Sequence, residues 1–319
     1  MMNMSKVLIT GGAGFIGSTF VKMMLSKGNE IVVLDALTYA GNKDNLKSIL
    51  DKITFIHGDI RNRKDVENAM KGCEEVAHFA AETHVDRSIT DPEPFLSTDV
   101  LGTGILLDVA RKLDVKKFLH VSTDEVYGSI KEGKFTEEDP FRPNSPYSSS
   151  KAGGDLLARA FYKTYGMPVL VVRPSNNYGP NQHPEKLMPL FITNLLMDKK
   201  VPVYGKGANV RDWLFVEDCC KGIMTVMDKG NFGEAYNIGG ECEKINMEVT
   251  RIILKLLGKT DGMINYVEDR KGHDFRYALS NDKIRKLGWS PTTPFDEGMR
   301  KTVEWYKSNS WWWKPRVMK

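Results

Sequence analysis

"ITGGAGFIGSTF", residues 9–20, joins a short apolar run to a segment with helical periodicity. Gly12, Gly14 and Gly17 match the spacing G-x-G-x-x-G, and Gly11, Gly14 and Gly17 also recur every three residues. Such glycines permit a tight turn between a strand and a helix, and they let backbone N–H groups approach a pyrophosphate at the helix N-terminus. The stretch therefore predicts a dinucleotide-binding turn, with a purely structural turn as the alternative.

Two carboxylates follow the next predicted strands. Asp35 ends "EIVVLD", where an acidic side chain would bond a ribose diol and repel a 2'-phosphate, so the sequence favours NAD over NADP. Asp59 lies in "HGDI" at the end of the third strand and suits the adenine edge of the cofactor. The alternative for Asp59 is a helix N-cap before "RNRKDVENAM".

Short β-branched runs alternate with helical periodicities from "KVLIT" to "MPVLVVRPS". This pattern predicts an α/β fold, with a Rossmann-type doubly wound parallel sheet and helices on both of its faces. The rhythm then changes to loops, a short strand "VPVYG" and helices near residues 216–227 and 247–257. We expect an NAD-binding domain over residues 1–178, to which the chain near residues 213–240 returns, and a smaller mixed α/β substrate domain over residues 179–319.

The composition excludes several kinds of partner. A formal charge of +4, from 45 basic and 41 acidic residues without a long run of one sign, indicates neither nucleic acid nor a membrane surface. Cys73, Cys219, Cys220 and Cys242 lack metal-ligand spacing and suit a reducing cytoplasm. No stretch approaches the roughly 20 apolar residues of a membrane span. We expect a cytoplasmic protein without a metal.

"KKFLHVSTDEVYG", residues 116–128, places Asp124 and Glu125 where a buried strand ends. A buried carboxylate pair is costly unless chemistry uses it, and the alternative is that the pair caps the next turn in solvent. Tyr147 and Lys151 are four residues apart at the start of a helix and so share one face. An ammonium group near a phenol favours the phenolate, which would make Tyr147 a usable base. The alternative is a surface aromatic beside a solvated lysine.

The glycine turn, a threonine at a strand end and the Tyr-x-x-x-Lys spacing together resemble the extended short-chain dehydrogenase/reductase superfamily over almost the whole chain. "STDEVYG" is similar to the hexose 4,6-dehydratases among its nucleotide-sugar enzymes, as are "HFAAETHVDRSI", "LTYAGN", "NNYGPNQHPEKLMPL", "NVRDWLFVEDCC", "NIGG" and "DRKGHDFRYAL". The resemblance implies oxidation at C4 of a glucose unit, loss of water across C5 and C6, and hydride return to C6. The product would be a 4-keto-6-deoxy sugar for deoxysugar biosynthesis of the rhamnose type.

The same resemblance implies a role for each reactive side chain. Tyr147 is the base of the oxidation, with Lys151 beside it and Thr123 as hydrogen-bonding partner. Glu125 is the base at C5, and Asp124 is the acid at the C6 hydroxyl. NAD is the cofactor and is regenerated in each cycle.

Binding residues are likewise carried over by the resemblance. The cofactor-binding positions are Gly11, Gly14, Phe15, Ile16, Gly17, Asp35, Thr38, Asp59, Ile60, Ala80, Ala81, Thr98, Tyr147, Lys151 and Asn177. The substrate-binding positions are Thr83, His84, Thr123, Asn176, Lys186, Leu187, Pro202, Tyr204, Arg211, Asn246, Arg270 and His273. Tyr204 is expected beside the nucleotide base, with a half-buried core tyrosine as the alternative. This sequence departs from the family at two positions. The family often has serine where Thr83 stands. It often has lysine where Ala36 stands, which puts one cofactor contact in question.

The substrate that the resemblance implies is dTDP-glucose. A UDP-glucose 4,6-dehydratase would carry the same catalytic residues, and a nucleotide-sugar 4-epimerase is the next alternative. A non-catalytic NAD-binding regulator is a third, although such proteins commonly lack the pair formed by Tyr147 and Lys151. The resemblance also implies a homodimer that pairs two long helices, over residues 95–113 and 148–165.

Overall fold

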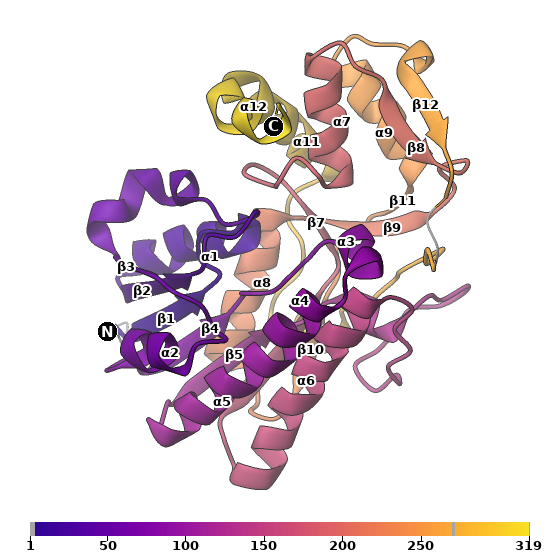
Figure 1. Cartoon of the computed structure of the whole chain (residues 1–319). Helices are drawn as coiled ribbons and strands as arrows, with labels where there is room; N and C mark the ends of the chain where they lie inside the picture. The colour runs from indigo at the N-terminus through magenta and orange to yellow at the C-terminus, as the bar shows by residue number, and fades with distance from the viewer. Residues whose placement is uncertain (1–3, 270–271, 319) are drawn as a thin grey trace.

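The computed structural model describes residues 4–269 and 272–318 (Figure 1). Its main sheet has seven parallel strands in the order β10-β6-β5-β4-β1-β2-β3. These strands are β1 Lys6–Thr10, β2 Glu30–Asp35, β3 Thr54–His57, β4 Glu75–His78, β5 Lys117–Val121, β6 Val169–Pro174 and β10 Ala235–Ile238. The strand order reverses between β1 and β4, so the predicted doubly wound fold is confirmed.

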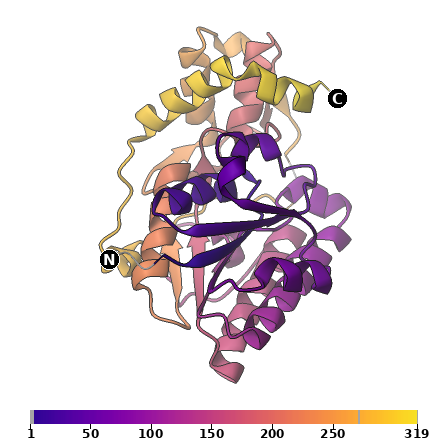
Figure 2. The ribbon, with the colours of Figure 1, turned by 90° about the vertical axis from the view of Figure 1, so that its left-hand side faces the viewer.

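Helices cover both faces of this sheet (Figure 2). One face carries α1 Phe15–Ser26 and α8 Val216–Lys229, and the other carries α2 Arg63–Met70, α5 Thr103–Lys112 and α6 Pro146–Tyr165. Successive side chains of β1 alternate between the faces: Val7 and Ile9 belong to the core under α1 and α8, whereas Leu8 belongs to the opposite core. Because both faces are buried, the strands are apolar at nearly every position.

The second half of the chain builds a smaller mixed α/β part. Its strands are β7 Asn176–Tyr178, β8 Val201–Tyr204, β9 Val210–Phe215, β11 Glu243–Ile245 and β12 Ile264–Val267, in sheets of order β11-β9-β7 and β12-β8. Its helices are α7 Leu187–Leu196, α9 Asn246–Leu256, α11 Phe295–Ser308 and α12 Ser310–Val317. The predicted helices near residues 216–227 and 247–257 are α8 and α9. The chain between these two helices includes β10, which pairs with β6 in the main sheet.

Short helical segments complete the chain. They are η1 Lys43–Lys52, α3 Val85–Thr90, α4 Glu93–Phe95, η2 Leu96–Gly102, η3 Asp124–Tyr127, η4 Asp261–Met263 and α10 Asp282–Arg285. The segment η2 is a π-helix between α4 and α5, so the long helix expected over residues 95–113 is not a uniform α-helix. Among the described helices, none is both long and apolar enough to cross a membrane.

A hydrogen-bonded chain ties the C-terminal helix to the glycine turn. The indole Nε1 of Trp312, in α12, donates to Asn45 Oδ1 at 2.8 Å. Asn45 Nδ2 in turn donates to the backbone oxygen of Ala13 at 2.9 Å. The C-terminal helix α12 is therefore tied through Asn45 to the predicted dinucleotide-binding turn.

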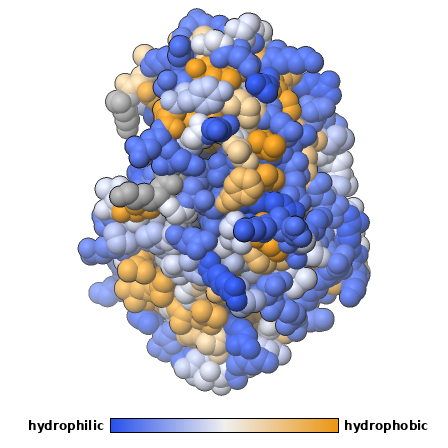
Figure 3. Space-filling view, turned by 90° about the vertical axis from the view of Figure 1, so that its right-hand side faces the viewer, coloured by the Kyte–Doolittle hydropathy of each residue, from blue (hydrophilic) through white to orange (hydrophobic). Residues whose placement is uncertain are grey.

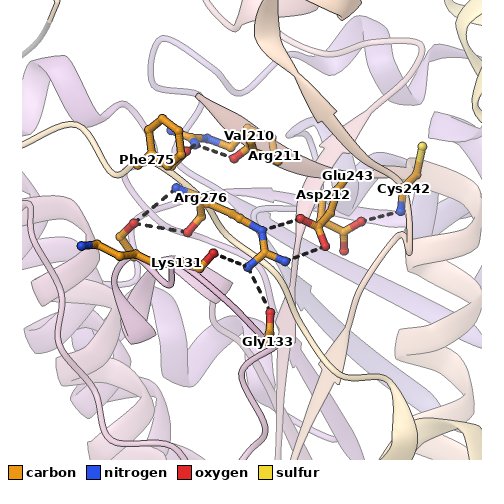
Figure 4. Close-up of polar contacts among 10 residues, drawn as sticks. Lys131, Gly133, Val210, Arg211, Asp212, Cys242, Glu243, Phe275 and Arg276 are labelled. Atoms are coloured by element: carbon orange, nitrogen blue, oxygen red, sulfur yellow. Dashed lines mark hydrogen bonds and ion pairs between the residues drawn. The ribbon is translucent and has the colours of Figure 1, made fainter. Parts of the chain in front are cut away.

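A strap, residues 272–280, connects the loop after β5 to the smaller part (Figure 4). Its Arg276 binds Glu243 of β11 through two N–H groups, at 2.6 and 2.9 Å, and donates to the backbone oxygen of Gly133 at 3.0 Å. Its backbone pairs with Phe135 on one side and with Val210 on the other. The strap thus holds the loop and β9 at a fixed separation.

Candidate active site

Three adjoining cavities form one cleft along the carboxyl ends of the main strands. The first is lined by predicted cofactor positions, namely Gly11, Gly14, Asp35, Thr38, Asp59, Ile60, Ala80, Ala81 and Thr98. The middle one shares Gly11 and Gly14 and adds Phe15, Ile16, Gly17, Thr83, Thr123, Asp124, Glu125, Tyr147, Lys151, Asn176, Asn177 and Lys186. The last shares Thr83, Glu125, Asn176, Asn177 and Lys186 and adds His84, Leu187, Pro202, Tyr204, Arg211, Asn246 and His273. Every described position that the sequence nominated lines this cleft, while Arg270 lies outside the described residues.

The glycine turn has the shape of a pyrophosphate cradle. Gly11 has φ +68°, and a Cβ atom there would lie 2.5 Å from the backbone nitrogen of Ala80. A Cβ atom on Gly17 would lie 2.2 Å from the backbone oxygen of Gly11, so neither position admits a side chain. Gly14 is the N-cap of α1, and no side chain in the described residues bonds to this helix end. The backbone N–H groups there suit an anion, which fits the phosphates of NAD.

Two carboxylates lie at the cofactor end of the cleft. Asp35 accepts hydrogen bonds from the backbone N–H groups of Ala13 and Leu37, at 2.9 and 2.8 Å, and this fixes the carboxylate at the end of β2. Asp59 binds the guanidinium and the backbone N–H of Arg61. Asn62, not Asp59, caps α2, so the capping alternative for Asp59 is wrong.

Asp124 and Glu125 begin the short turn η3 after β5. Thr123 caps this turn, because its hydroxyl accepts from the backbone N–H of Glu125 at 3.3 Å. Asp124 is only 2% exposed, and its Oδ2 has no hydrogen-bond partner among the described residues. Burial and the neighbouring charge of Glu125 raise the pKa of Asp124 well above its usual range. The alternative of a carboxylate pair capping a turn in solvent is therefore wrong.

Tyr147 and Lys151 lie on the first turns of α6, which starts with a capping box formed by Ser145 and Ser148. Both reactive side chains are buried, and Lys151 Nζ donates to the backbone oxygen of Val121 at 2.7 Å. Burial raises the pKa of Tyr147 well above its usual range, and the negative charge of nearby carboxylates adds to this. Desolvation and these carboxylates therefore oppose the expected effect of Lys151, which is to favour the phenolate.

Asp99 is a buried carboxylate that the sequence argument missed. It lies in the π-helix η2, accepts from Ser150 Oγ of α6 at 2.7 Å and accepts from the backbone N–H of Glu82 at 2.9 Å. Burial raises the pKa of Asp99 to about 6, although the charge of Lys151 opposes the shift. An acidic residue within the apolar helix "FLSTDVLGTGILL" was the signal that could have drawn attention to it.

At the far end of the cleft, Arg211 is held by the strap. Its guanidinium donates to the backbone oxygens of Asp274 and Phe275, at 3.0 and 3.3 Å, and stacks on the ring of Tyr277. Asp274 is fixed in turn, because Asn144 Nδ2 and the Tyr277 hydroxyl each donate to it at 2.6 Å. A buried cation held in this way suits a diphosphate.

The other nominated side chains surround the same end of the cleft. Lys186 Nζ donates to the backbone oxygen of Thr83. The Tyr204 hydroxyl donates to Asp86 at 3.4 Å, and its ring packs edge-on against His273. Tyr204 is exposed, so the alternative of a half-buried core tyrosine is wrong.

Several buried polar atoms in the cleft have no hydrogen-bond partner among the described residues. They include Asn176 Oδ1, Asn246 Oδ1, Gln182 Oε1 and Trp213 Nε1. Buried polar groups are normally paired, so these atoms point to a polar ligand. Gln182 and Trp213 were missed from the sequence, because a single glutamine and a single tryptophan have no spacing that marks them as ligand contacts. The described residues contain no group of three or more His, Cys, Asp or Glu side chains placed to hold a metal ion.

The reactive centre combines a tyrosine-lysine pair with a buried acid and a neighbouring carboxylate, beside a dinucleotide cradle. This equipment suits a dehydratase that oxidises its substrate transiently. A family model described as GDP-mannose 4,6 dehydratase matches residues 8–302, and the chain belongs to this family.

Known relatives agree with this assignment. A dTDP-glucose 4,6-dehydratase of Streptomyces niveus is 50% identical over 97% of this chain and 95% of its own length. The low-salt glycan biosynthesis protein Agl12 of Haloferax volcanii is also 50% identical, over 94% of this chain and 98% of its own. The crystal structure of a dTDP-glucose 4,6-dehydratase from Streptomyces venezuelae, with NAD bound, is 50% identical with a TM-score of 0.96, over 98% of this chain and 99% of that one.

Proposed function

We propose that this chain converts dTDP-glucose to dTDP-4-keto-6-deoxyglucose, as an NAD-dependent hydro-lyase of deoxysugar biosynthesis. The observation that carries the proposal is the buried Asp124 beside Glu125, placed in the cleft between the dinucleotide cradle and Arg211. The relatives named dTDP-glucose 4,6-dehydratase support the substrate.

Each reactive side chain has one task in the proposed reaction. When bound, NAD supplies a hydride acceptor and a positive charge in the cleft. Tyr147 takes the proton of the C4 hydroxyl, with Lys151 and Thr123 positioning it. Glu125 takes the proton from C5, which the C4 ketone has made acidic, and Asp124 gives a proton to the departing C6 hydroxyl. A carboxyl group with a raised pKa is suited to that donation, because it keeps its proton to higher pH than an ordinary aspartic acid does.

The remaining nominated residues have binding roles in this proposal. The glycine cradle, Asp35, Thr38, Asp59, Ile60, Ala80, Ala81, Thr98 and Asn177 hold NAD. Thr83, His84, Asn176, Lys186, Leu187, Pro202, Tyr204, Arg211, Asn246 and His273 hold the nucleotide sugar. The NAD-binding part comprises residues 1–178 together with α8 and β10, and the substrate part comprises the rest of residues 179–319.

Two other enzymatic activities are less well supported. An epimerase moves a hydride only at C4 and has no use for the buried acid Asp124. A UDP-glucose 4,6-dehydratase differs only in the nucleotide base of its substrate, and Tyr204 is proposed to contact that nucleotide base. Tyr147 and Lys151, both buried in the cleft, argue against a regulator without turnover.

The test is to incubate the enzyme separately with dTDP-glucose and UDP-glucose and to measure 4-keto product. With deuterium at C4, we expect the label at C6 of the same molecule, and we expect solvent deuterium at C5. An epimerase would return the label to C4, and a simple dehydrogenase would release it on the reduced cofactor. Crossover of deuterium between labelled and unlabelled sugars would contradict a single closed site.

We further infer that the enzyme is a homodimer. The helices η2 and α6 expose large apolar side chains side by side: Leu96 and Leu156 are 53% exposed and Leu101 is 58% exposed. Apolar side chains also gather on the lower half of the side shown in Figure 3. A patch of this kind on paired helices suits a second copy of the chain.

In the described residues all four cysteines are unpaired, which supports a cytoplasmic location.

A further inference from the structure

Three loop segments meet at the middle cavity of the cleft, and we name them the clasp: residues 36–41 after β2, residues 83–87 after β4 and residues 182–186 before α7. The middle cavity is lined by the glycine turn and by members of all three segments, among them Ala40, Thr83, His183, Glu185 and Lys186. The first cavity is lined by further residues of the first segment, namely Ala36, Thr38 and Gly41. The clasp therefore forms part of the wall of both cavities that the proposal assigns to NAD.

Tyr39, in the first segment, contacts both of the other segments. The guanidinium carbon of Arg87 lies 3.8 Å from the centroid of the Tyr39 ring, within the range in which a cation is attracted to the face of the ring. The Tyr39 hydroxyl and Thr83 Oγ1 share a hydrogen bond at 3.4 Å. The ring of His183 packs edge-on against Tyr39, with the two centroids 5.6 Å apart. Tyr39 thus joins the first segment of the clasp to the second and the third.

Arg87 connects Tyr39 with the third segment. Its Nη2 atom lies 3.4 Å from Glu185 Oε2, so one guanidinium stacks on the ring and pairs with the carboxylate. Lys186 Nζ adds a contact between the same two segments, because it donates to the backbone oxygen of Thr83. Each contact of Arg87 is weak by itself, since half of this side chain is exposed. Loss of one member should therefore loosen the clasp without unfolding the sheet.

We propose that the contacts of Arg87 with Tyr39 and Glu185 keep the clasp closed and so retain NAD through successive turnovers, an inference that rests on the proposed place of NAD in the cleft. Neither Arg87 nor Tyr39 lines any of the three cavities, so both act by positioning the segments that do. The far end of the cleft is lined by residues outside the clasp, namely Pro202, Tyr204, Arg211 and Asn246. The nucleotide sugar can therefore exchange there while the clasp stays closed over a cofactor that each cycle regenerates.

The test is the rate at which bound NAD exchanges for labelled NAD, measured without substrate. We expect exchange to be about tenfold faster in Arg87→Met and in Tyr39→Leu than in wild type, the factor that the loss of one cation–π contact can supply. The double variant should exchange no faster than either single variant, because both lose the same contact. At saturating NAD we expect kcat to change less than about threefold, since the reactive groups are untouched.

Arg111→Met is the matched control. Its guanidinium also stacks on a tyrosine, Tyr165, at 4.9 Å and also pairs with a carboxylate, that of Asp108, but it does not line the cleft or contact the clasp. We expect this variant to exchange NAD at the wild-type rate.

Two outcomes would overturn the role of the clasp. One is exchange of NAD by Arg87→Met at the wild-type rate. The other is a higher KM for the nucleotide sugar with unchanged NAD exchange, which would place Arg87 in the substrate site. If Arg87→Met does not fold, comparison of Tyr39→Leu with Tyr39→Phe, which keeps the ring, decides the matter. Wild-type enzyme that forms no 4-keto product would refute the proposed function instead, so the two failures are distinguishable.

Discussion

Asp124 and Glu125 are neighbours in sequence but not in environment. Asp124 is enclosed by protein and has a raised pKa, whereas Glu125 lines both the middle and the substrate cavities. Two carboxylates in different surroundings can take opposite roles in proton transfer at the same pH. This difference supports the proposal that Asp124 is the acid and Glu125 is the base.

Replacing the base should separate oxidation from dehydration. For Glu125→Gln we expect the C4 oxidation to remain possible while water loss falls roughly a hundredfold or more. The measurement is the absorbance of reduced nicotinamide in the mixture with dTDP-glucose, which should accumulate in this variant. Tyr147→Phe is the control, because it should remove both the absorbance and the product. Normal dehydration by an Asp124→Asn, Glu125→Gln double variant would mean that neither carboxylate is catalytic.

Asp99 should make the stability of the fold depend on pH. Its pKa is raised from 3.8 to about 6, so the folded state binds the proton more tightly than the unfolded state. The contribution of this proton to the free energy of unfolding is present at low pH and is lost as pH rises through about 6. The total loss is about 3 kcal/mol. We therefore expect Asp99→Asn to be more stable than wild type above pH 7, by about 1–3 kcal/mol, with little difference near pH 4.

Urea unfolding at several pH values measures this effect. Asp51→Asn is the control, because Asp51 is exposed in η1 and should change the pH dependence little. Equal stability of Asp99→Asn and wild type at both ends of the range would mean that Asp99 is paired more strongly with Lys151 than its burial suggests.

At the scale of single elements, the strap is the feature that joins the two parts of the cleft. Arg276 fixes the strap to β11 and to the loop after β5. Two other backbone oxygens of the strap hold the guanidinium of Arg211. The strap therefore positions a cation that the proposal assigns to the diphosphate, although Arg276 itself does not line the cleft.

Removing the Arg276 guanidinium should weaken binding of the nucleotide sugar more than it slows the chemical steps. For Arg276→Met we expect the KM for the nucleotide sugar to rise about tenfold with kcat changed less than about threefold, because Arg211 loses its fixed position but the reactive groups do not. Arg285→Met is the control, since Arg285 pairs with Glu241 on the surface. A fall in kcat at constant KM would contradict a positioning role of the strap.

The elements differ in how far the sequence predicts them. The apolar strands, the helix that carries Tyr147 and Lys151, and the glycine turn follow from local patterns, and the structure has them. The π-helix η2 has no local signature, since its composition also suits an α-helix. The strap could not be predicted either, because its bonding partners Gly133 and Glu243 are more than 100 residues apart in the chain.

At the scale of the whole molecule, the nominated cleft residues come from segments spread over the chain, from Gly11 to His273. Motif spacing and family resemblance could nominate them because each lies in or beside a recognisable short pattern. The same reasoning did not single out Trp213, which lies within "NVRDWLFVEDCC", or Asp99, which follows Thr98. Their significance depends on burial and on partners supplied by distant segments.

A charge on the exposed apolar face should disrupt the proposed dimer. For Leu101→Lys we expect a monomer in light scattering, because a lysine there would have to be buried against the second copy. Leu50→Lys is the control, since Leu50 is exposed on η1, away from the helices η2 and α6. A monomeric wild-type enzyme, or a Leu101→Lys variant that remains dimeric, would contradict this interface.

The position of β10 has a consequence for how the protein is made. This strand pairs with β6, but the ribosome synthesises it only after β7, β8, β9 and α8. Until residue 238 has emerged, β6 presents an unpaired edge, which is a template for association with another chain. The nascent polypeptide thus completes its seven-stranded sheet late in translation, and a message truncated before codon 235 would yield a product prone to aggregation.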